Sequence, residues 1–215
     1  MVQKHSDFIA NLKQFEGKVD HLYLDSRGNP TIGIGFMMAN VDQFCALLMH
    51  TKQHKPATNK QKRDEYLRLS QLPSGYKAQW YKAQCQLYLP EQQCDIVLHH
   101  HLGQFERELA VIFNRKNGFK QEFHSLPNPV KSALLDMVFN LGSHHLANHW
   151  PKLHHAIKQQ DWQRAAKECH RKHIQTERNK QTALWFKSAA SDTRSYSWVK
   201  WLVRKILNRK SLFGK

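Results

Sequence analysis

The sequence predicts an α+β fold that is mainly helical, in which a small β-hairpin lobe and a larger helical lobe are joined by a long helix. Apolar residues recur at helical spacing along most of the chain, and residues 21–35 read as two short strands around a turn. After Pro90 the helical spacing continues unbroken for about 20 residues. The 215 residues can bury a core within one domain of two lobes or two small domains.

The composition favours a packed globular protein over a disordered chain. Apolar residues make up 40% of the sequence, and it contains six Trp. No run of about 18 apolar residues is present, so we expect no transmembrane helix. The N-terminal residues mix charges with apolar residues at helical spacing, unlike a cleaved signal peptide. Export would therefore need other machinery.

The chain is strongly basic. Its formal net charge is +16, from 33 Lys and Arg against 17 Asp and Glu, which predicts an anionic partner. Nucleic acid, anionic lipid and bacterial envelope polymers all meet this condition. No nucleic-acid-binding motif accompanies the charge, so we do not expect a nucleic-acid partner.

The cysteines and histidines do not indicate a metal site. The four cysteines show neither a CxxC pair nor zinc-knuckle spacing. We interpret them as free thiols, and a disulfide between Cys85 and Cys94 stays an alternative. Three consecutive histidines, 99–101, fall in the expected long helix, where neighbouring side chains point in different directions and cannot form one site.

The stretch 15–35 begins with a helix end that carries a carboxylate. Apolar residues at helical spacing over 7–15 predict a short helix that Gly17 ends. Glu16 then lies in the last turn, where the negative end of the helix dipole disfavours the ionised carboxylate and so raises the pKa. A general acid needs such a raised pKa.

A β-hairpin is expected next. Residues 21–25 alternate as a strand, the following five are rich in turn formers, and 31–35 read as the return strand. On that strand Thr31, Gly33 and Gly35 share one face. Glycine repeated on one strand face indicates close approach of a ligand or of another backbone.

The region 37–88 has a weaker pattern, and we interpret it as an insertion of unknown role. Residues 41–50 look helical, and 51–64 form a basic, loop-like segment. Two further helical pieces are predicted at 66–72 and 76–88.

The following region is expected to be helical. Residues 89–92 predict a helix start with Pro at the first position, and this helix is long enough to bridge two lobes. Residues 130–141 are apolar nearly all round, so their helix should lie in the core of the larger lobe. Further helices are predicted at 150–159, 161–173 and 176–188.

The last residues, 194–215, hold seven Lys and Arg and no acid. Their apolar residues share one helical face, which is typical of a helix that binds an anionic membrane surface. A terminal helix packed on the body of the protein is the alternative.

One group of residues points to a known family. Glu16 lies at the expected helix end, and Asp25 follows nine residues later. Thr31, fifteen residues after the Glu, starts the run Thr-Ile-Gly-Ile-Gly. This pattern resembles the phage lysozymes of glycoside hydrolase family 24. The resemblance covers about 140 of the 215 residues and extends to segments of the helical region: 89–112, 133–142 and 161–171.

The resemblance implies a lysozyme-like two-lobe fold and a peptidoglycan hydrolase (muramidase). Glu16 would be the general acid that protonates the glycosidic oxygen, Asp25 the second carboxylate, and Thr31 would help to place the attacking water. The enzyme would cut the β-1,4 bond between N-acetylmuramic acid and N-acetylglucosamine with inversion, which predicts roughly 6.5 to 9.5 Å between the carboxyl groups. No metal or organic cofactor is implied.

The resemblance also implies four substrate-binding residues. Gly35 would lie under the bound sugar. Phe139 and Asn140 match positions that face the cleft, with a core role as the alternative for Phe139. Arg178 would pair with Glu16, which would lower the pKa of the acid.

These expectations give a lysozyme-like catalytic domain at 1–191 and a basic amphipathic extension at 192–215. The catalytic domain would contain a small β lobe at about 17–36 and the insertion at about 37–88. The inter-lobe helix would start at about 90, and the helical lobe would span 125–191. We expect a monomer made in the cytoplasm without a signal peptide, which reaches the periplasmic cell wall by release or secretion. A phage endolysin and a bacterial effector with an immunity protein are both compatible with the sequence.

The alternative function is a cationic envelope-disrupting antibacterial protein that acts mainly through its C-terminal helix. Deleting residues 194–215 separates the two functions. We expect hydrolysis of isolated peptidoglycan to be unchanged and lysis of whole cells to be reduced, because the basic segment would no longer attract the anionic envelope. Equal lysis of whole cells by the full and truncated chains would remove any role for the segment.

Overall fold

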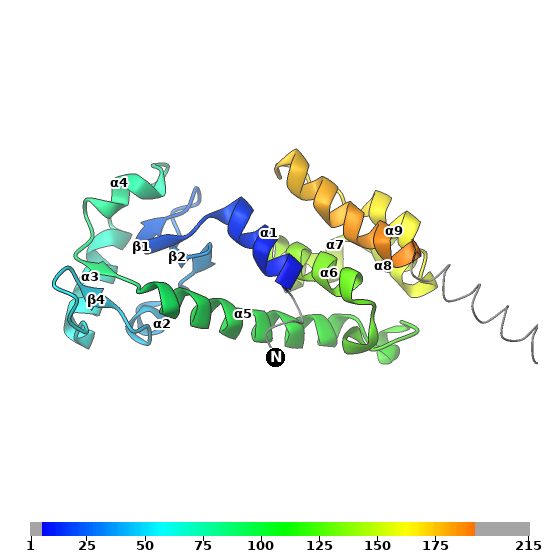
Figure 1. The fold of residues 1–215 in the computed structure, drawn as a ribbon, viewed down its shortest axis with the longest axis horizontal. Coiled ribbons are helices and arrows are strands. Elements are labelled where there is room, and N and C mark those ends of the chain that lie inside the picture. Colours follow the sequence, from blue (N-terminus) through cyan, green and yellow to red (C-terminus); the bar gives the residue numbers. More distant parts are fainter. Residues whose placement is uncertain (1–5, 192–215) are drawn as a thin grey trace, which may run out of the picture. The chain divides into compact units, whose positions relative to one another are not determined.

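The computed structural model describes residues 6–191 (Figure 1). It is mainly helical with two small antiparallel sheets, so the predicted α+β, mainly α class is confirmed. The chain divides into two compact units, which we call the sheet unit, Ile9–Gly103, and the helical unit, formed by 6–8 and 104–191. The predicted basic helix at 194–215 lies outside the described residues.

The first helix, α1, spans Ser6–Glu16 and ends as predicted. Gly17 follows with φ of +69°, and its amide donates to the carbonyl of Lys13. A left-handed conformation suits glycine, which lacks the Cβ that would clash, and it ends the helix. Leu12 on the inner face of α1 is buried.

The predicted hairpin is part of a three-stranded antiparallel sheet in the order β1-β2-β3. The strands are β1, β2 and β3, at Val19–Leu24, Pro30–Gly33 and Phe36–Met37. Tyr23 of β1 pairs with Thr31 of β2. The sequence analysis did not include β3.

The return strand is shorter than predicted. Gly33 and Gly35 both take a positive φ, +70° and +73°, so the chain turns after Gly33 and enters β3. Ile32 and Ile34 are fully buried. A Cβ added at Gly33 would lie 3.3 Å from the ring of Phe36, so glycine here also serves close packing inside the sheet.

Region 37–88 contains three short helices and a second sheet. Thr58 and Gln61 form a capping box, in which each side chain accepts the other's backbone N–H. A helix therefore starts inside the segment predicted as a loop, and that prediction is wrong from residue 59 on. The helices predicted at 41–50 and 76–88 are too long, because β4 and β5 pair where they were expected to continue. The elements are α2, β4, α3, α4 and β5, at Val41–Cys45, His50–Thr51, Asn59–Ser70, Ala78–Lys82 and Leu87–Tyr88.

A buried carboxylate joins this second sheet to α3. Glu65 is 4% exposed and accepts hydrogen bonds from the backbone amides of Gln86 and Leu87, at 2.7 and 2.9 Å. Burial raises the pKa of Glu65, and the two amides oppose this shift. The sequence analysis missed this contact because Glu65 and Gln86 are 21 residues apart.

The long helix α5 spans Glu91–Ile112 and starts after Pro90 as predicted. The boundary between the two units falls within it. No helix among residues 6–191 combines the length and apolarity needed to cross a bilayer.

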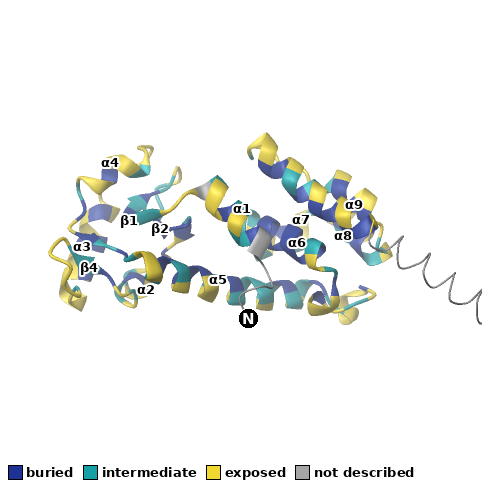
Figure 2. Ribbon diagram, in the orientation of Figure 1, coloured by how far each residue is buried: buried dark blue, intermediate teal, exposed yellow. Residues whose placement is uncertain are grey.

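In the helical unit, α6 spans Asn128–Leu141 and is the predicted core helix: residues 130–138 are all buried. Gly142 follows it with φ of +77°. The remaining helices are α7, α8 and α9, at Ser143–His149, Pro151–Gln159 and Trp162–Glu168, and a last helix over 176–191 whose buried positions recur at helical spacing (Figure 2).

Two details of the helical unit differ from the predictions. The helix α7 was not predicted, and α9 is shorter than the predicted 161–173, because the chain leaves the helix at Cys169 and His173 has φ of +62°. All four cysteines are free thiols, so the alternative of a disulfide between Cys85 and Cys94 is not realised. Burial raises the pKa of Cys85 to about 12.

Candidate active site

The predicted site residues fall into two groups. Glu16, Asp25, Thr31 and Gly35 belong to the sheet unit, and the other predicted residues belong to the helical unit. Glu16 is the last residue of α1, directly before the hairpin, and its side chain lies outside the described part of the chain. The separation of the two carboxyl groups therefore stays a prediction.

Asp25 closes the turn between β1 and β2 with its carboxylate. Its Oδ1 accepts hydrogen bonds from the backbone amides of Arg27 and Asn29, both at 2.8 Å, and its Oδ2 accepts one from Asn29 Nδ2 at 3.0 Å. The Gly28 amide also donates to the Asp25 carbonyl at 3.0 Å. This arrangement holds the half-exposed carboxylate in one orientation at the tip of the hairpin.

Thr31 is tied to the same turn. It is only 3% exposed, and its hydroxyl donates to the carbonyl of Asn29 at 2.9 Å. Asn29 thus contacts Asp25 and Thr31, two of the three predicted reactive residues, although no role was predicted for it. The Thr31 oxygen keeps lone pairs that can accept a hydrogen bond from water.

Gly35 lies in the tight connection between β2 and β3 and is partly exposed. Its φ of +73° requires the conformational freedom of glycine. The turn explains the glycine, and the predicted contact with a bound sugar stays a prediction.

Phe139 and Asn140 lie in the last turn of α6, and both are half-buried. The ring of Phe139 packs edge to face against Phe105, with centroids 6.0 Å apart, and the guanidinium of Arg178 lies 5.6 Å from its centre. The packing of Phe139 fits its alternative role in the core. Of the predicted substrate-binding residues, the structure thus brings Phe139 and Arg178 into contact.

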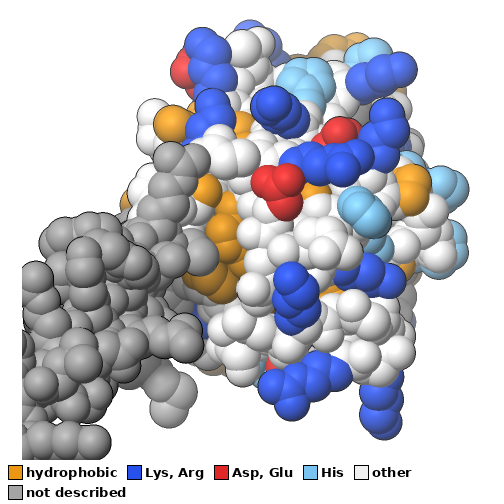
Figure 3. Space-filling model, turned by 90° about the vertical axis from the view of Figure 1, so that its right-hand side faces the viewer, with side chains coloured by type: hydrophobic (Ala, Val, Ile, Leu, Met, Phe, Trp, Pro, Cys, Tyr) orange, Lys and Arg blue, Asp and Glu red, His pale blue; other side chains and the backbone are white. Residues whose placement is uncertain are grey.

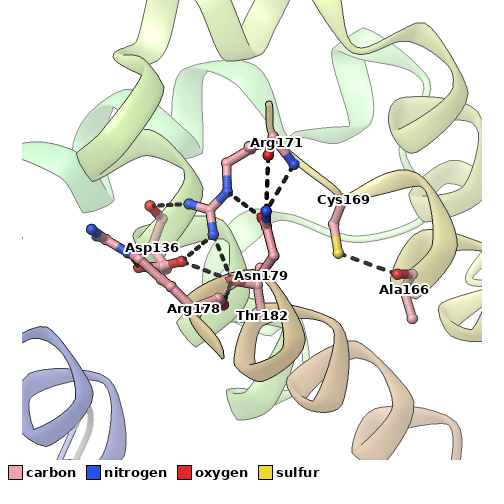
Figure 4. A network of polar contacts seen from close by, with 7 residues as sticks. All are labelled: Asp136, Ala166, Cys169, Arg171, Arg178, Asn179 and Thr182. Atoms are coloured by element: carbon pink, nitrogen blue, oxygen red, sulfur yellow. Dashed lines mark hydrogen bonds and ion pairs between the residues drawn. The ribbon is translucent and has the colours of Figure 1, made fainter. Parts of the chain in front are cut away.

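Arg178 belongs to a buried polar network around Asp136 (Figure 4). Its Nε donates to Asp136 Oδ1 at 2.8 Å, and Arg171 Nη2 donates to Asp136 Oδ2 at 2.7 Å. The Thr182 hydroxyl lies 2.7 Å from the same Oδ2. The predicted pairing of Arg178 with Glu16 is not among the described contacts, since the Glu16 side chain is not described.

This network combines three charges that are almost fully buried. The side chains of Arg171, Arg178 and Asp136 are 1%, 6% and 4% exposed. Removing one partner from such a group leaves an uncompensated buried charge, which is strongly destabilising. Asn179 completes the network by accepting from the Arg171 amide and donating to its carbonyl.

The sequence analysis did not identify Asp136, Arg171, Asn179 or Thr182. One signal was present: Asp136 is the only acid in a helix that is apolar nearly all round, and a buried carboxylate requires a cationic partner. The identity of the partners was not readable, because Arg171 lies 35 residues away.

Two hollows in the sheet unit lie away from the hairpin tip. They have volumes of about 410 and 310 Å³, and residues of the insertion form most of their walls. Neither has Asp25 or Thr31 in its lining. No group of three or more His, Cys, Asp and Glu side chains among the described residues could hold a metal ion.

No family model matches this chain, and no curated protein matches it either. Support for a function therefore comes from the residues of the hairpin and from their geometry.

Replacing Asp136 with Asn tests the buried network. We expect Asp136→Asn to lower the free energy of unfolding by about 3 to 5 kcal/mol, because Arg171 and Arg178 both lose the buried carboxylate that they share. Asp42→Asn is the matched control: Asp42 pairs with Arg63 on the surface, with side chains 80% and 51% exposed, and its loss should cost less than about 1 kcal/mol. Urea unfolding at neutral pH measures both, and equal losses would contradict the proposed importance of the network.

Proposed function

We propose that this protein is a peptidoglycan hydrolase of the lysozyme type, with a lysozyme-like two-lobe fold, that cuts between N-acetylmuramic acid and N-acetylglucosamine. The observation that carries the proposal is the hairpin directly after Glu16. It presents Asp25 at its tip, held by three hydrogen bonds, and places Thr31 beside it through the shared contact with Asn29. Two carboxylates and a hydroxyl in this order match the resemblance to family 24.

The proposed reaction uses Glu16 as an acid and Asp25 as a base. Glu16 gives its proton to the glycosidic oxygen as the bond to the anomeric carbon breaks, and water attacks that carbon from the opposite face of the sugar. Asp25 accepts a proton from this water. Thr31 accepts a hydrogen bond from the same water and so helps to orient it.

The charge of the surface fits an anionic polymer as substrate. Lys and Arg side chains are spread over the face shown in Figure 3, with few Asp and Glu among them. Peptidoglycan carries carboxylates on its peptides, so this surface would attract it over distances of order the Debye length, about 8 to 10 Å at ordinary salt.

Replacing Glu16 with Gln tests the acid. We expect Glu16→Gln to lower the turnover of isolated peptidoglycan by on the order of 10² to 10⁴-fold, since the amide cannot donate the proton. Glu168→Gln is the matched control, because Glu168 is also the last residue of a helix, α9. Mass analysis of the released muropeptides identifies the bond that is cut. Full activity of Glu16→Gln, or products of an amidase, would overturn the proposal.

Replacing Asp25 with Asn tests its charge separately from the turn. The two backbone amides both donate to Oδ1, which an amide oxygen can replace, and only the contact between Oδ2 and Asn29 Nδ2 is lost. The double variant Asp25→Asn/Asn29→Asp restores that contact with donor and acceptor exchanged.

We expect the double variant to unfold at nearly the same urea concentration as the wild type and to lose on the order of 10²-fold in turnover. Such a result would assign the loss to the reactive carboxylate. Wild-type turnover by the double variant would show that Asp25 serves the turn alone.

A further inference from the structure

The insertion exposes a stacked aromatic pair. The rings of Tyr76 and Trp80 lie 4.3 Å apart with 16° between their planes, and the two residues are 50% and 37% exposed. Two adjacent large rings left in contact with water form a larger apolar surface than a lone exposed side chain does.

The helix that carries Trp80 is packed against buried groups. Trp80 rests against the fully buried ring of Tyr81 at 5.0 Å and 89°, and the Tyr81 hydroxyl donates to the carbonyl of Pro73 at 2.7 Å. The ring of His21, from β1, bonds to the carbonyl of Ala78 at 2.8 Å. A surface fixed in this way loses little conformational entropy when a ligand binds.

The same segment lies near the turn that carries Asp25. A Cβ added at Gly28 would lie 3.7 Å from the Cβ of Ser74, so residue 74 is next to this turn. Tyr76 follows two residues later, and α4 lies beside β1 (Figure 1). A polymer bound at the hairpin tip can therefore continue along the insertion to the aromatic pair.

The chemistry of the pair suits a sugar chain. The faces of aromatic rings carry partial negative charge, and the C–H bonds on one face of a pyranose ring present partial positive charge to them. The exposed Lys77 lies between the two aromatic residues in sequence and supplies a positive charge for the carboxylates of peptidoglycan.

We propose that Tyr76 and Trp80 form a sugar-binding platform that holds the glycan strand of peptidoglycan next to the Asp25 turn. This inference rests on the proposed function for the identity of the polymer. The platform binds the strand and takes no part in bond cleavage. Its loss should weaken binding to the polymer and raise KM, and leave kcat near that of the wild type.

The test is sedimentation of the protein with insoluble peptidoglycan, which measures binding without hydrolysis. We expect Tyr76→Ala/Trp80→Ala to weaken binding about tenfold or more. Tyr76→Phe/Trp80→Phe should bind within about twofold of the wild type, because stacking remains. Leu48→Ala, at another exposed apolar residue of the insertion, should bind like the wild type. Urea unfolding of each variant shows whether it is folded.

The outcomes separate this inference from the proposed function. Unchanged binding by the folded alanine double variant would overturn the platform, even where Glu16→Gln abolishes hydrolysis. Weakened binding by that variant would support the platform, even where Glu16→Gln leaves hydrolysis intact and the muramidase proposal fails. If the alanine variant does not fold, the other two variants decide. Equal weakening of binding in the phenylalanine and Leu48→Ala variants would overturn the platform. Wild-type binding by both variants, together with competition from soluble chitin oligosaccharides, would support it. Loss of binding to single-stranded DNA alone would identify a nucleic-acid surface and overturn the assignment to sugar.

Discussion

The carboxylate of Asp136 is the constraint on which the helical unit depends. It lies in the middle of α6, where nine successive residues, 130–138, are buried, so water cannot solvate its charge. Arg171, which follows the end of α9, and Arg178, on the last helix, both donate hydrogen bonds to this carboxylate. The same contacts place Arg178 over the ring of Phe139. The contact between Arg178 and Phe139 thus accompanies the neutralisation of one buried charge.

The hairpin tip uses a carboxylate in a related way. Asp25 satisfies backbone amides that a tight turn leaves without partners, and the same bonds fix the direction of the group proposed to react. Glu65 does the same for two amides of the second sheet, although no reaction is proposed for it. An acid that closes a turn is therefore no sign of catalysis by itself. The functional argument comes from Glu16, Asp25 and Thr31 occurring together around one hairpin.

The insertion adds surface beside the hairpin. It contributes a separate small sheet, brings Ser74 next to the turn and holds two exposed rings on the segment that follows. A hairpin tip that carried only the reactive groups would contact the substrate just around the glycosidic bond that is cut. An adjoining aromatic surface extends the contact along a polymer without altering the chemistry at the tip.

Features that depend on near neighbours along the chain were readable from the sequence. Helical periodicity predicted α1, α5 and α6. Gly17 and Gly142 predicted where α1 and α6 end, and Pro90 predicted where α5 begins. The turn formers predicted the β1–β2 hairpin with Asp25 at its tip. Even the capping box that starts α3 was readable, and was overlooked among the charges of that segment.

Features that depend on distant residues required the folded structure. The strands β4 and β5 pair Thr51 with Leu87, 36 positions along the chain, so no local pattern predicts the pairing. The partners of Asp136 and Glu65 were likewise unreadable, because a buried polar group must find some partner and sequence spacing does not say which one. The proximity of Gly28 and Ser74 has the same origin, and it brings the insertion next to the candidate active site.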